Sequence, residues 1–369
     1  MFPSGESMKP VLQSAVAAGL LATAIAAATA AAPSAPNNPL RVSMYAATGG
    51  QVEVIVTNTS RKAARVPRWE LPSSALQAKL FQVSLDGKPV QYTGMLAKRG
   101  LPGAQDFVVI APGQSLRSVI DLGSAYDLAK AGQYTVTLAS PLQHASMSDR
   151  SMLKTARGLP MLLQSAPMQL WHDGAAAKSG AGKGKPGGGG GGGGTVVNGV
   201  TYVGCSSTQI SGAGAGVVQA RVYSEDAKGY LASGTAGSRY TTWLGAYTSS
   251  RYNTAKSHFV AIDGAIDQSG GQVTINCGCK DRRTYAYVYP TQPYQIYVCG
   301  AFWSAPTAGT DSKGGTLIHE MSHFNVTAGT DDIVYGQTGA KNLAATDPDG
   351  ALNNADNHEY FAENNPHLN

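Results

Sequence analysis

The 369-residue sequence has few charged residues and, after its first 32 positions, no long apolar run. Asp, Glu, Lys and Arg make up 14% of the chain, whereas 45 residues are glycine, which is more typical of an exported, loop-rich protein than of a cytosolic helical one. No basic stripe with interleaved aromatic residues is present, so we do not expect a nucleic-acid binder. No later segment is apolar enough to span a bilayer, so we expect no stable membrane association.

Cysteine is also scarce, and all four cysteines lie in the C-terminal half: Cys205, Cys277, Cys279 and Cys299. An even number of cysteines in an exported chain favours two disulfides. The Cys277-Gly-Cys279 pair could instead belong to a metal clip, but no second pair follows at zinc-finger spacing. Disulfides are therefore the prediction.

The N-terminus has the pattern of a secretory signal peptide. Lys9 precedes an apolar stretch, Val11–Ala28, which is followed by small residues and then Pro33. This pattern predicts a signal over residues 1–32 and a secreted protein. A membrane helix is the alternative, but the stretch is rich in alanine and lacks a positively charged stop-transfer flank.

Residues 33–173 are predicted to form an all-β, sandwich-like domain, because short runs of alternating apolar residues are separated by turns. Asp86-Gly87 lies between two such runs and predicts a hairpin turn. The residues expected to share buried strand faces are Val52, Val54 and Val56, then Phe81, Val83 and Leu85, then Tyr134, Val136 and Leu138.

Residues 174–194 read as a flexible linker, since they end in eight consecutive glycines, Gly187–Gly194, which cannot bury apolar surface. The lysines at 178, 183 and 185 make this linker a predicted processing region.

Residues 195–369 predict an α+β domain that is mainly helical with a small sheet. Helices are expected after Cys205, at about 252–266, around residue 319, and over 336–363. Strands are expected at 273–275, 285–289 and 296–298. The inner face of the first helix is predicted to contain Ile210, Val217, Val218, Ala220 and Tyr223.

Charge is unevenly divided between the two halves. Residues 195–369 hold 10 Lys and Arg against 14 Asp and Glu, a balance of −4, whereas the rest of the chain holds 18 against 9, a balance of +9. Opposite balances predict that the two halves attract each other.

The segment that predicts chemistry is His-Glu-Met-Ser-His, residues 319–323. On a helix, His319 and His323 lie on one face and can bind one cation, while Glu320 can act as a general base beside it. Two histidines on the surface of an exposed helix are the alternative, but the apolar residues around them favour a buried helix. A catalytic zinc needs a third ligand, and the nearest carboxylates are Asp331 and Asp332, just after Gly329.

HEMSH followed by GTDDIVYG resembles the deuterolysin, or aspzincin, family of zinc endopeptidases. The resemblance implies one Zn²⁺ per chain, a zincin-like catalytic domain, ligands His319, His323 and Asp332, Glu320 as general base, and Tyr335 as the phenol facing the reacting carbonyl. Asp331 would be a turn or supporting residue. Stretches between residues 200 and 366 resemble the peptidyl-Lys metalloendopeptidases in particular, which implies the disulfides Cys205–Cys277 and Cys279–Cys299.

Asp356 and Glu359 lie three positions apart on a predicted helix. Spacing alone allows a solvated acidic face, but the resemblance implies a pocket that binds the lysine following the cut bond. We therefore expect a secreted, monomeric zinc endopeptidase that cuts proteins and peptides before lysine. The N-terminal domain would be its propeptide and intramolecular inhibitor. A broader exported protease toxin and a non-catalytic, zinc-stabilised binding module are the alternatives.

Overall fold

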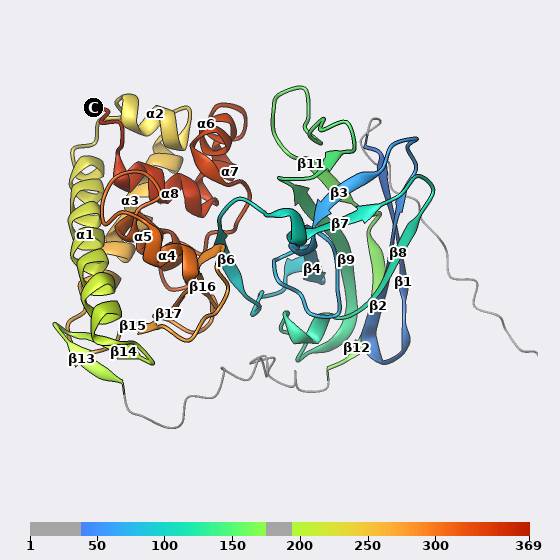
Figure 1. Ribbon diagram of the computed structural model, residues 1–369, viewed down its shortest axis with the longest axis horizontal. Helices are drawn as coiled ribbons and strands as arrows, with labels where there is room; N and C mark the ends of the chain where they lie inside the picture. The colour runs from blue at the N-terminus through green and yellow to red at the C-terminus, as the bar shows by residue number, and fades with distance from the viewer. Residues whose placement is uncertain (1–37, 175–193) are drawn as a thin grey trace, which may run out of the picture.

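The computed structural model describes residues 38–174 and 194–369, which form two regions side by side (Figure 1). The predicted signal peptide and the linker lysines at 178, 183 and 185 lie outside these residues. Strands dominate the N-terminal region and helices the C-terminal region. No helix within the described ranges has both the length and the apolar character needed to cross a bilayer.

The N-terminal region is all-β, with 3-10 turns as its only helical elements among residues 38–174. Its strands are β1 (Leu40–Ala46), β2 (Gln51–Asn58), β3 (Ala64–Pro67), β4 (Phe81–Leu85), β5 (Lys88–Pro89), β6 (Leu96–Arg99), β7 (Phe107–Ile110), β8 (Ser115–Asp121), β9 (Ala131–Leu142), β10 (Ser146–Met147), β11 (Met161–Gln164) and β12 (Met168–Asp173). They form the sheets β1-β2-β8, β10-β3-β7 and β11-β9-β4-β5, and β12 also pairs with β9.

The alternating pattern reports the core of this region correctly. Eight of the nine residues expected on the inner strand faces are buried in one cluster, and the ninth, Leu85, packs against it half-buried. Asp86 and Gly87 form the turn between β4 and β5, with φ values of 51° and 74°, the backbone expected of a two-residue hairpin.

Strand β6 leaves its own region and joins a six-stranded sheet of the C-terminal region, in the order β13-β14-β15-β17-β16-β6. The sheet therefore ends on a strand contributed by the other half of the molecule (Figure 1). Its remaining strands are β13 (Thr195–Val197), β14 (Val200–Val203), β15 (Thr274–Asn276), β16 (Thr284–Val288) and β17 (Gln295–Val298).

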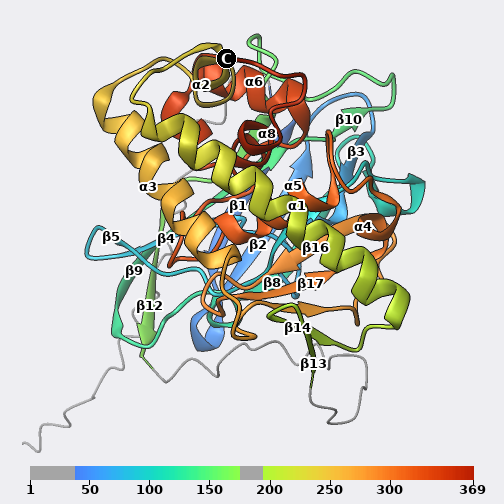
Figure 2. The ribbon, with the colours of Figure 1, turned by 90° about the vertical axis from the view of Figure 1, so that its left-hand side faces the viewer.

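Eight α-helices complete the described part of the C-terminal region: α1 (Ser207–Ala232), α2 (Ser238–Leu244), α3 (Ser249–Ile266), α4 (Gly300–Ser304), α5 (Lys313–Ser322), α6 (Gly336–Thr346), α7 (Pro348–Leu352) and α8 (Ala355–Glu363). Helix α1 crosses the front of this region in Figure 2 and packs on α5 behind it. Helix α5 also contacts α8, β16 and β6, so it lies at the centre of the region.

Two details of the helix prediction are wrong. Val218 is exposed on α1, because Val217 beside it is buried and adjacent helical residues cannot share one face. The segment 336–363 forms three helices rather than one. Pro348 begins α7, which forces Asp347 out of the helical conformation, with φ −149° and ψ 80°.

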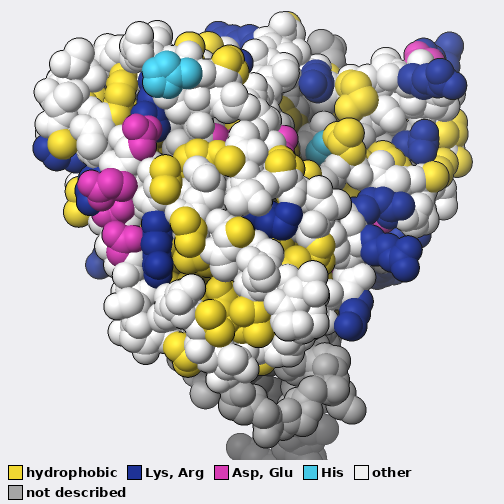
Figure 3. Space-filling view, turned by 60° about the vertical axis from the view of Figure 1, so that its left-hand side comes forward, with side chains coloured by type: hydrophobic (Ala, Val, Ile, Leu, Met, Phe, Trp, Pro, Cys, Tyr) yellow, Lys and Arg dark blue, Asp and Glu magenta, His cyan; other side chains and the backbone are white. Residues whose placement is uncertain are grey.

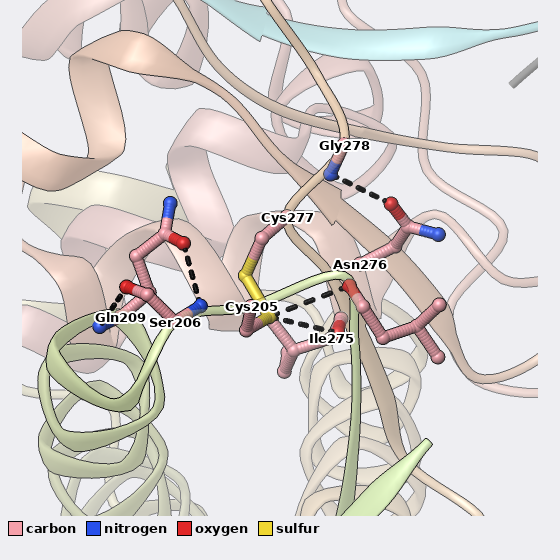
Figure 4. Close-up of a disulfide and its surroundings, with 8 residues drawn as sticks. Cys205, Ser206, Gln209, Ile275, Asn276, Cys277 and Gly278 are labelled. Atoms are coloured by element: carbon pink, nitrogen blue, oxygen red, sulfur yellow. Dashed lines mark hydrogen bonds between the residues drawn. A yellow bond between two sulfur atoms is a disulfide. The ribbon is translucent and has the colours of Figure 1, made fainter. Parts of the chain in front are cut away.

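Both predicted disulfides are present, and the described residues contain no free cysteine. Cys205–Cys277 joins the segments that follow β14 and β15, next to the capping box of Ser206 and Gln209 at the start of α1 (Figure 4). Cys279–Cys299 joins the segments before β16 and after β17. The alternative of a cysteine metal clip is therefore excluded.

Candidate active site

Helix α5 places the two histidines. Its N-terminus is capped by Ser312, whose hydroxyl accepts a hydrogen bond from Gly315 N–H at 2.9 Å, and every one of its residues is buried. Leu317, Ile318 and Met321 pack into the hydrophobic core of the C-terminal region. The apolar neighbours expected from the sequence thus bury the helix, and its polar residues need partners within the protein.

The chain turns back immediately after α5. Gly329 has φ 62°, a conformation that favours glycine, and Thr330 N–H donates to Ser322 O at 3.1 Å. Because of this turn, Asp332 returns to the histidines. Its Oδ1 lies 3.1 Å from Nε2 of His319 and 3.5 Å from Nε2 of His323.

These three atoms form a cluster that suits a metal ion. They lie within 4.8 Å of one another, and all three are buried without a hydrogen-bond partner. Two imidazole nitrogens and one carboxylate oxygen match the three-ligand set of a catalytic zinc. Within residues 38–174 and 194–369, no fourth His, Cys, Asp or Glu joins the group. The side chains therefore fit the metal that the sequence implied.

Further contacts orient the candidate ligands. Nδ1 of His323 lies 2.8 Å from Thr330 O, and Nδ1 of His319 lies 2.8 Å from Oδ1 of Asp356. The second contact is an ion pair without hydrogen-bond geometry, and the same Nδ1 lies 3.4 Å from Oε2 of Glu359. Partners on the second ring nitrogen hold a ligand's orientation and tautomer. Burial opposes ionisation of Asp332, but the two histidines outweigh it and lower its pKa.

Glu320 lies beside this group and is fully buried. Its Oε1 accepts a hydrogen bond from Lys98 N–H at 3.2 Å, whereas Oε2 has no partner. Burial raises the pKa of Glu320 to about 7. A carboxyl group in this range can both take up and release a proton near neutral pH.

Tyr335 precedes α6 and is held on two sides. Its backbone N–H donates to Gln143 Oε1 at 2.7 Å, and its hydroxyl donates to Ala97 O at 2.8 Å. Burial raises the pKa of Tyr335 well above its ordinary value, so the phenol stays protonated and acts as a hydrogen-bond donor.

Three carboxylates surround the ammonium of Lys98, which belongs to the N-terminal region. Nζ lies 2.7 Å from Glu359, 3.1 Å from Asp311 and 3.6 Å from Asp356. Burial alone would lower the pKa of Lys98, but Asp356 and Glu359 outweigh it and raise the pKa well above its ordinary value. We call these three carboxylates the ammonium pocket; its lysine is charged and buried, with 3% of the side chain exposed.

The aromatic rings of Tyr285 and Tyr360 complete the pocket, at 5.3 Å and 5.7 Å from Nζ of Lys98. Tyr360 also donates its hydroxyl to Asp311 at 2.7 Å. The sequence led to Asp356 and Glu359 but not to Asp311. Asp311 belongs to the sequence Gly-Thr-Asp, residues 309–311, just before Ser312, the N-cap of α5. This position beside a helix cap is the only local feature of the sequence that draws attention to Asp311.

Other contacts between the two regions surround the site. Lys79 pairs with Asp331 at 2.8 Å, and Arg283 pairs with Asp106 at 3.0 Å. A cavity of about 490 Å³ lies next to the site, between Lys79 and Leu96 on one side and Asp332 and Tyr335 on the other. On the face shown in Figure 3, acidic side chains gather at the left, whereas Lys and Arg dominate the right-hand edge.

Comparisons with known proteins agree with this chemistry. The aspzincin family, described as "Lysine-specific metallo-endopeptidase", matches residues 230–363. An "Extracellular protease" of Aeromonas hydrophila is 42% identical over 318 residues, covering 86% of this chain and 88% of the relative. A "Peptidyl-Lys metalloendopeptidase" of Grifola frondosa is 40% identical over 284 residues, covering 77% and 76%.

Two further matches cover less of the chain. A "Peptidyl-Lys metalloendopeptidase" of Pleurotus ostreatus is 53% identical over 169 residues, covering 46% of this chain and 99% of the relative. The solved structure of a zinc peptidase from Grifola frondosa is 46% identical, with a TM-score of 0.43, and covers 45% of this chain and 100% of that one.

Proposed function

The chain belongs to the aspzincin family of metalloendopeptidases, and we propose that it is a secreted zinc enzyme that hydrolyses the peptide bond before lysine. The observation that carries the lysine specificity is the ammonium pocket. It holds a lysine ammonium within 2.7–3.6 Å of three carboxylates, immediately beside the candidate metal group.

His319, His323 and Asp332 would hold the zinc, since their unpartnered atoms converge and are buried. When bound, zinc would supply Lewis-acid chemistry, polarising the substrate carbonyl and activating a water molecule. Asp356 and Thr330 would keep the two imidazoles in position through their Nδ1 atoms.

The chain's own residues supply the remaining steps. Glu320 is placed to accept a proton from the attacking water and to return it to the departing amine, because its Oε1 already faces a backbone N–H. Tyr335 is placed to donate a hydrogen bond to the carbonyl oxygen as negative charge develops there. The ammonium pocket fixes the lysine that follows the bond, and a compact ammonium suits converging point charges better than a planar guanidinium does.

We further propose that the N-terminal region is a propeptide that inhibits the enzyme in the same chain. Lys98 fills the ammonium pocket, and Ala97 N–H donates to the second oxygen of Asp332 at 3.0 Å. Glu320 and Tyr335 are also hydrogen-bonded to β6. No lysine of another protein could enter while β6 stays in place, so removal of this region would be required for activity on other proteins.

Secretion is proposed on three grounds. Both disulfides are of the kind formed in oxidising compartments. The first 32 residues have the pattern of a signal peptide. The Aeromonas hydrophila relative is named an extracellular protease.

Digestion of an unfolded protein by the processed enzyme, followed by mass spectrometry, tests the proposal. New peptides should begin with lysine, and both a metal chelator and the Glu320→Gln variant should abolish them. Cuts with no preference for lysine would contradict the role of the ammonium pocket. Cuts that persist after complete metal removal would contradict the metal centre.

A further inference from the structure

Strand β6 is bound in the way that a substrate of the proposed enzyme would be bound. Its residues pair antiparallel with β16: Leu96 with Val288, Ala97 with Tyr287, and Lys98 with Ala286, before a register shift. A strand added to a sheet edge is held in an extended form by main-chain hydrogen bonds, and its side chains are selected by pockets. Lys98 is the side chain that enters such a pocket here.

The peptide bond between Ala97 and Lys98 lies between the two candidate catalytic groups. On one side, the Ala97 carbonyl oxygen accepts the hydroxyl hydrogen of Tyr335 at 2.8 Å. On the other side, the Lys98 N–H donates to Glu320 Oε1 at 3.2 Å. These are the carbonyl and the leaving amine of one peptide bond, each facing the group proposed to act on it.

The segment is anchored beyond both ends of this bond. Ala97 N–H donates to Asp332, and Gly100 N–H donates to Arg283 O at 2.8 Å. Arg99 donates to the backbone of Gln77 at 2.9 Å. These contacts hold the reacting groups close together, which is the positional requirement for an efficient reaction.

Burial distinguishes Lys98 from Lys79. Lys79 also reaches the C-terminal region, but it pairs with Asp331 and is 35% exposed. Lys98 alone among the described lysines occupies the ammonium pocket. The three lysines of the linker lie outside the described residues.

We propose that Ala97–Lys98 is a processing bond of the precursor, hydrolysed by the chain's own active site. This inference rests on the proposed function. One water molecule is consumed: its oxygen joins the carbonyl carbon of Ala97, the bond from that carbon to Lys98 N breaks, and a proton is delivered to Lys98 N. Glu320 is the group within hydrogen-bond distance of that nitrogen.

The cut would also weaken the inhibitory contact. A new carboxylate at Ala97 would lie close to Asp332 and Glu320, and like charges that close repel each other. Residues 38–97 would then be held by non-covalent contacts alone, while Lys98 would begin the remaining chain.

The full-length precursor, purified and supplied with zinc, provides the main test. Intact-mass analysis and N-terminal labelling should reveal a fragment that begins at Lys98. Its rate of formation should be first order and unchanged on dilution, since the bond and the site share one chain. Glu320→Gln should prevent the fragment, and Lys88→Ala, which changes an exposed lysine of the same region, should not affect it.

A second measurement does not depend on turnover. In the Glu320→Gln precursor, an amine-acylating reagent should leave Lys98 unmodified over a period in which Lys88 is fully modified. Equal labelling of the two lysines would overturn the placement of Lys98. Protection of Lys98 together with an Ala97–Lys98 bond that stays intact in the wild-type precursor would overturn the cleavage.

The outcomes separate this inference from the proposed function. If the processed enzyme cuts other proteins before lysine while the precursor never yields a Lys98 terminus, the function stands and the processing bond is refuted. If the processed enzyme shows no preference for lysine, the proposed specificity itself is refuted.

Discussion

Asp356 contacts both the candidate metal ligand and the bound lysine, and Asp356→Ala should therefore impair two properties at once. Its Oδ1 lies 2.8 Å from Nδ1 of His319 and 3.6 Å from Nζ of Lys98. Its Oδ2 accepts the N–H of Gly336 at 2.6 Å, at the start of α6. The sequence assigned Asp356 to substrate binding alone, which predicts that its loss leaves the metal in place.

Asp356→Ala should weaken zinc binding, because Asp356 is the partner of the second ring nitrogen of His319. Removing the partner of a histidine ligand typically reduces metal affinity by about 10- to 100-fold, which is about 1.4–2.8 kcal/mol. Asp311→Ala is the matched variant, because Asp311 contacts Lys98 and Tyr360 but no candidate ligand. A hydrogen bond to a charged group contributes about 1.5–3 kcal/mol. Since Asp311 is 42% exposed, its loss should be near the lower value, roughly a ten-fold fall in kcat/KM for lysine substrates.

Two measurements on the processed enzyme separate these effects. Competition with a chelator of known affinity gives the dissociation constant for zinc. The ratio of kcat/KM for two peptides that differ only in lysine or methionine after the cut bond gives the preference for lysine. Asp356→Ala should weaken both, and Asp311→Ala only the second. Wild-type zinc affinity in Asp356→Ala would refute the positioning role of Asp356.

Three further predictions follow from the buried groups. Glu320→Gln should retain zinc, as measured by metal analysis, and lose about 10²- to 10⁴-fold in kcat; near-normal turnover would exclude Glu320 as the base. Tyr335→Phe should leave the melting temperature unchanged and lower kcat by about 10²-fold or more, whereas an effect on KM alone would indicate a binding role. Burial lowers the pKa of His358 to about 3, so its neutral ring stabilises the fold above pH 6.5, and this stabilisation is lost as the pH falls from 6.5 towards 3. The free energy of unfolding should fall by about 1.4 kcal/mol per pH unit in that range. His358→Gln should reduce this dependence of unfolding free energy on pH, whereas the control His367→Gln, at an exposed position, should not. An unchanged pH dependence in His358→Gln would contradict the role given to His358.

Local rules were sufficient for the part of the site that lies on one helix. His319 and His323 come together because residues four apart share a helical face. The arrival of Asp332 depends on the turn at Gly329 and on the hydrogen bond from Thr330 to Ser322. The sequence identified Asp332 through resemblance rather than through geometry, since spacing alone left Asp331 and Asp332 as alternatives.

Asp311 could not be predicted by such rules, because its position depends on contacts between distant segments. Glu363, at the end of α8, accepts hydrogen bonds from the backbone N–H groups of Asp311 and Ser312. This interaction folds the loop before α5 onto α8 and brings Asp311 to the other two carboxylates. The sequence around Asp311 contains no periodic pattern that reports this contact.

Strand β6 was missed for a related reason. It has only four residues, and it pairs outside its own region, with Lys98 and Glu320 lying 222 positions apart in the chain. Short strands of mixed polarity give weak sequence signals, and their pairing is decided by tertiary contacts. The burial of Lys98 is therefore a property of the assembled molecule.

The opposite net charges of the two halves led us to expect attraction between them, and the structure shows which ion pairs form between the two regions. Lys79–Asp331 and the Lys98 contacts have the expected polarity, whereas Arg283–Asp106 has the reverse. Among these ion pairs, the one between Lys98 and Glu359 is the most deeply buried, and breaking it would leave a costly unpaired charge. Buried pairs are screened little by salt. We therefore expect that high salt alone does not separate the two regions.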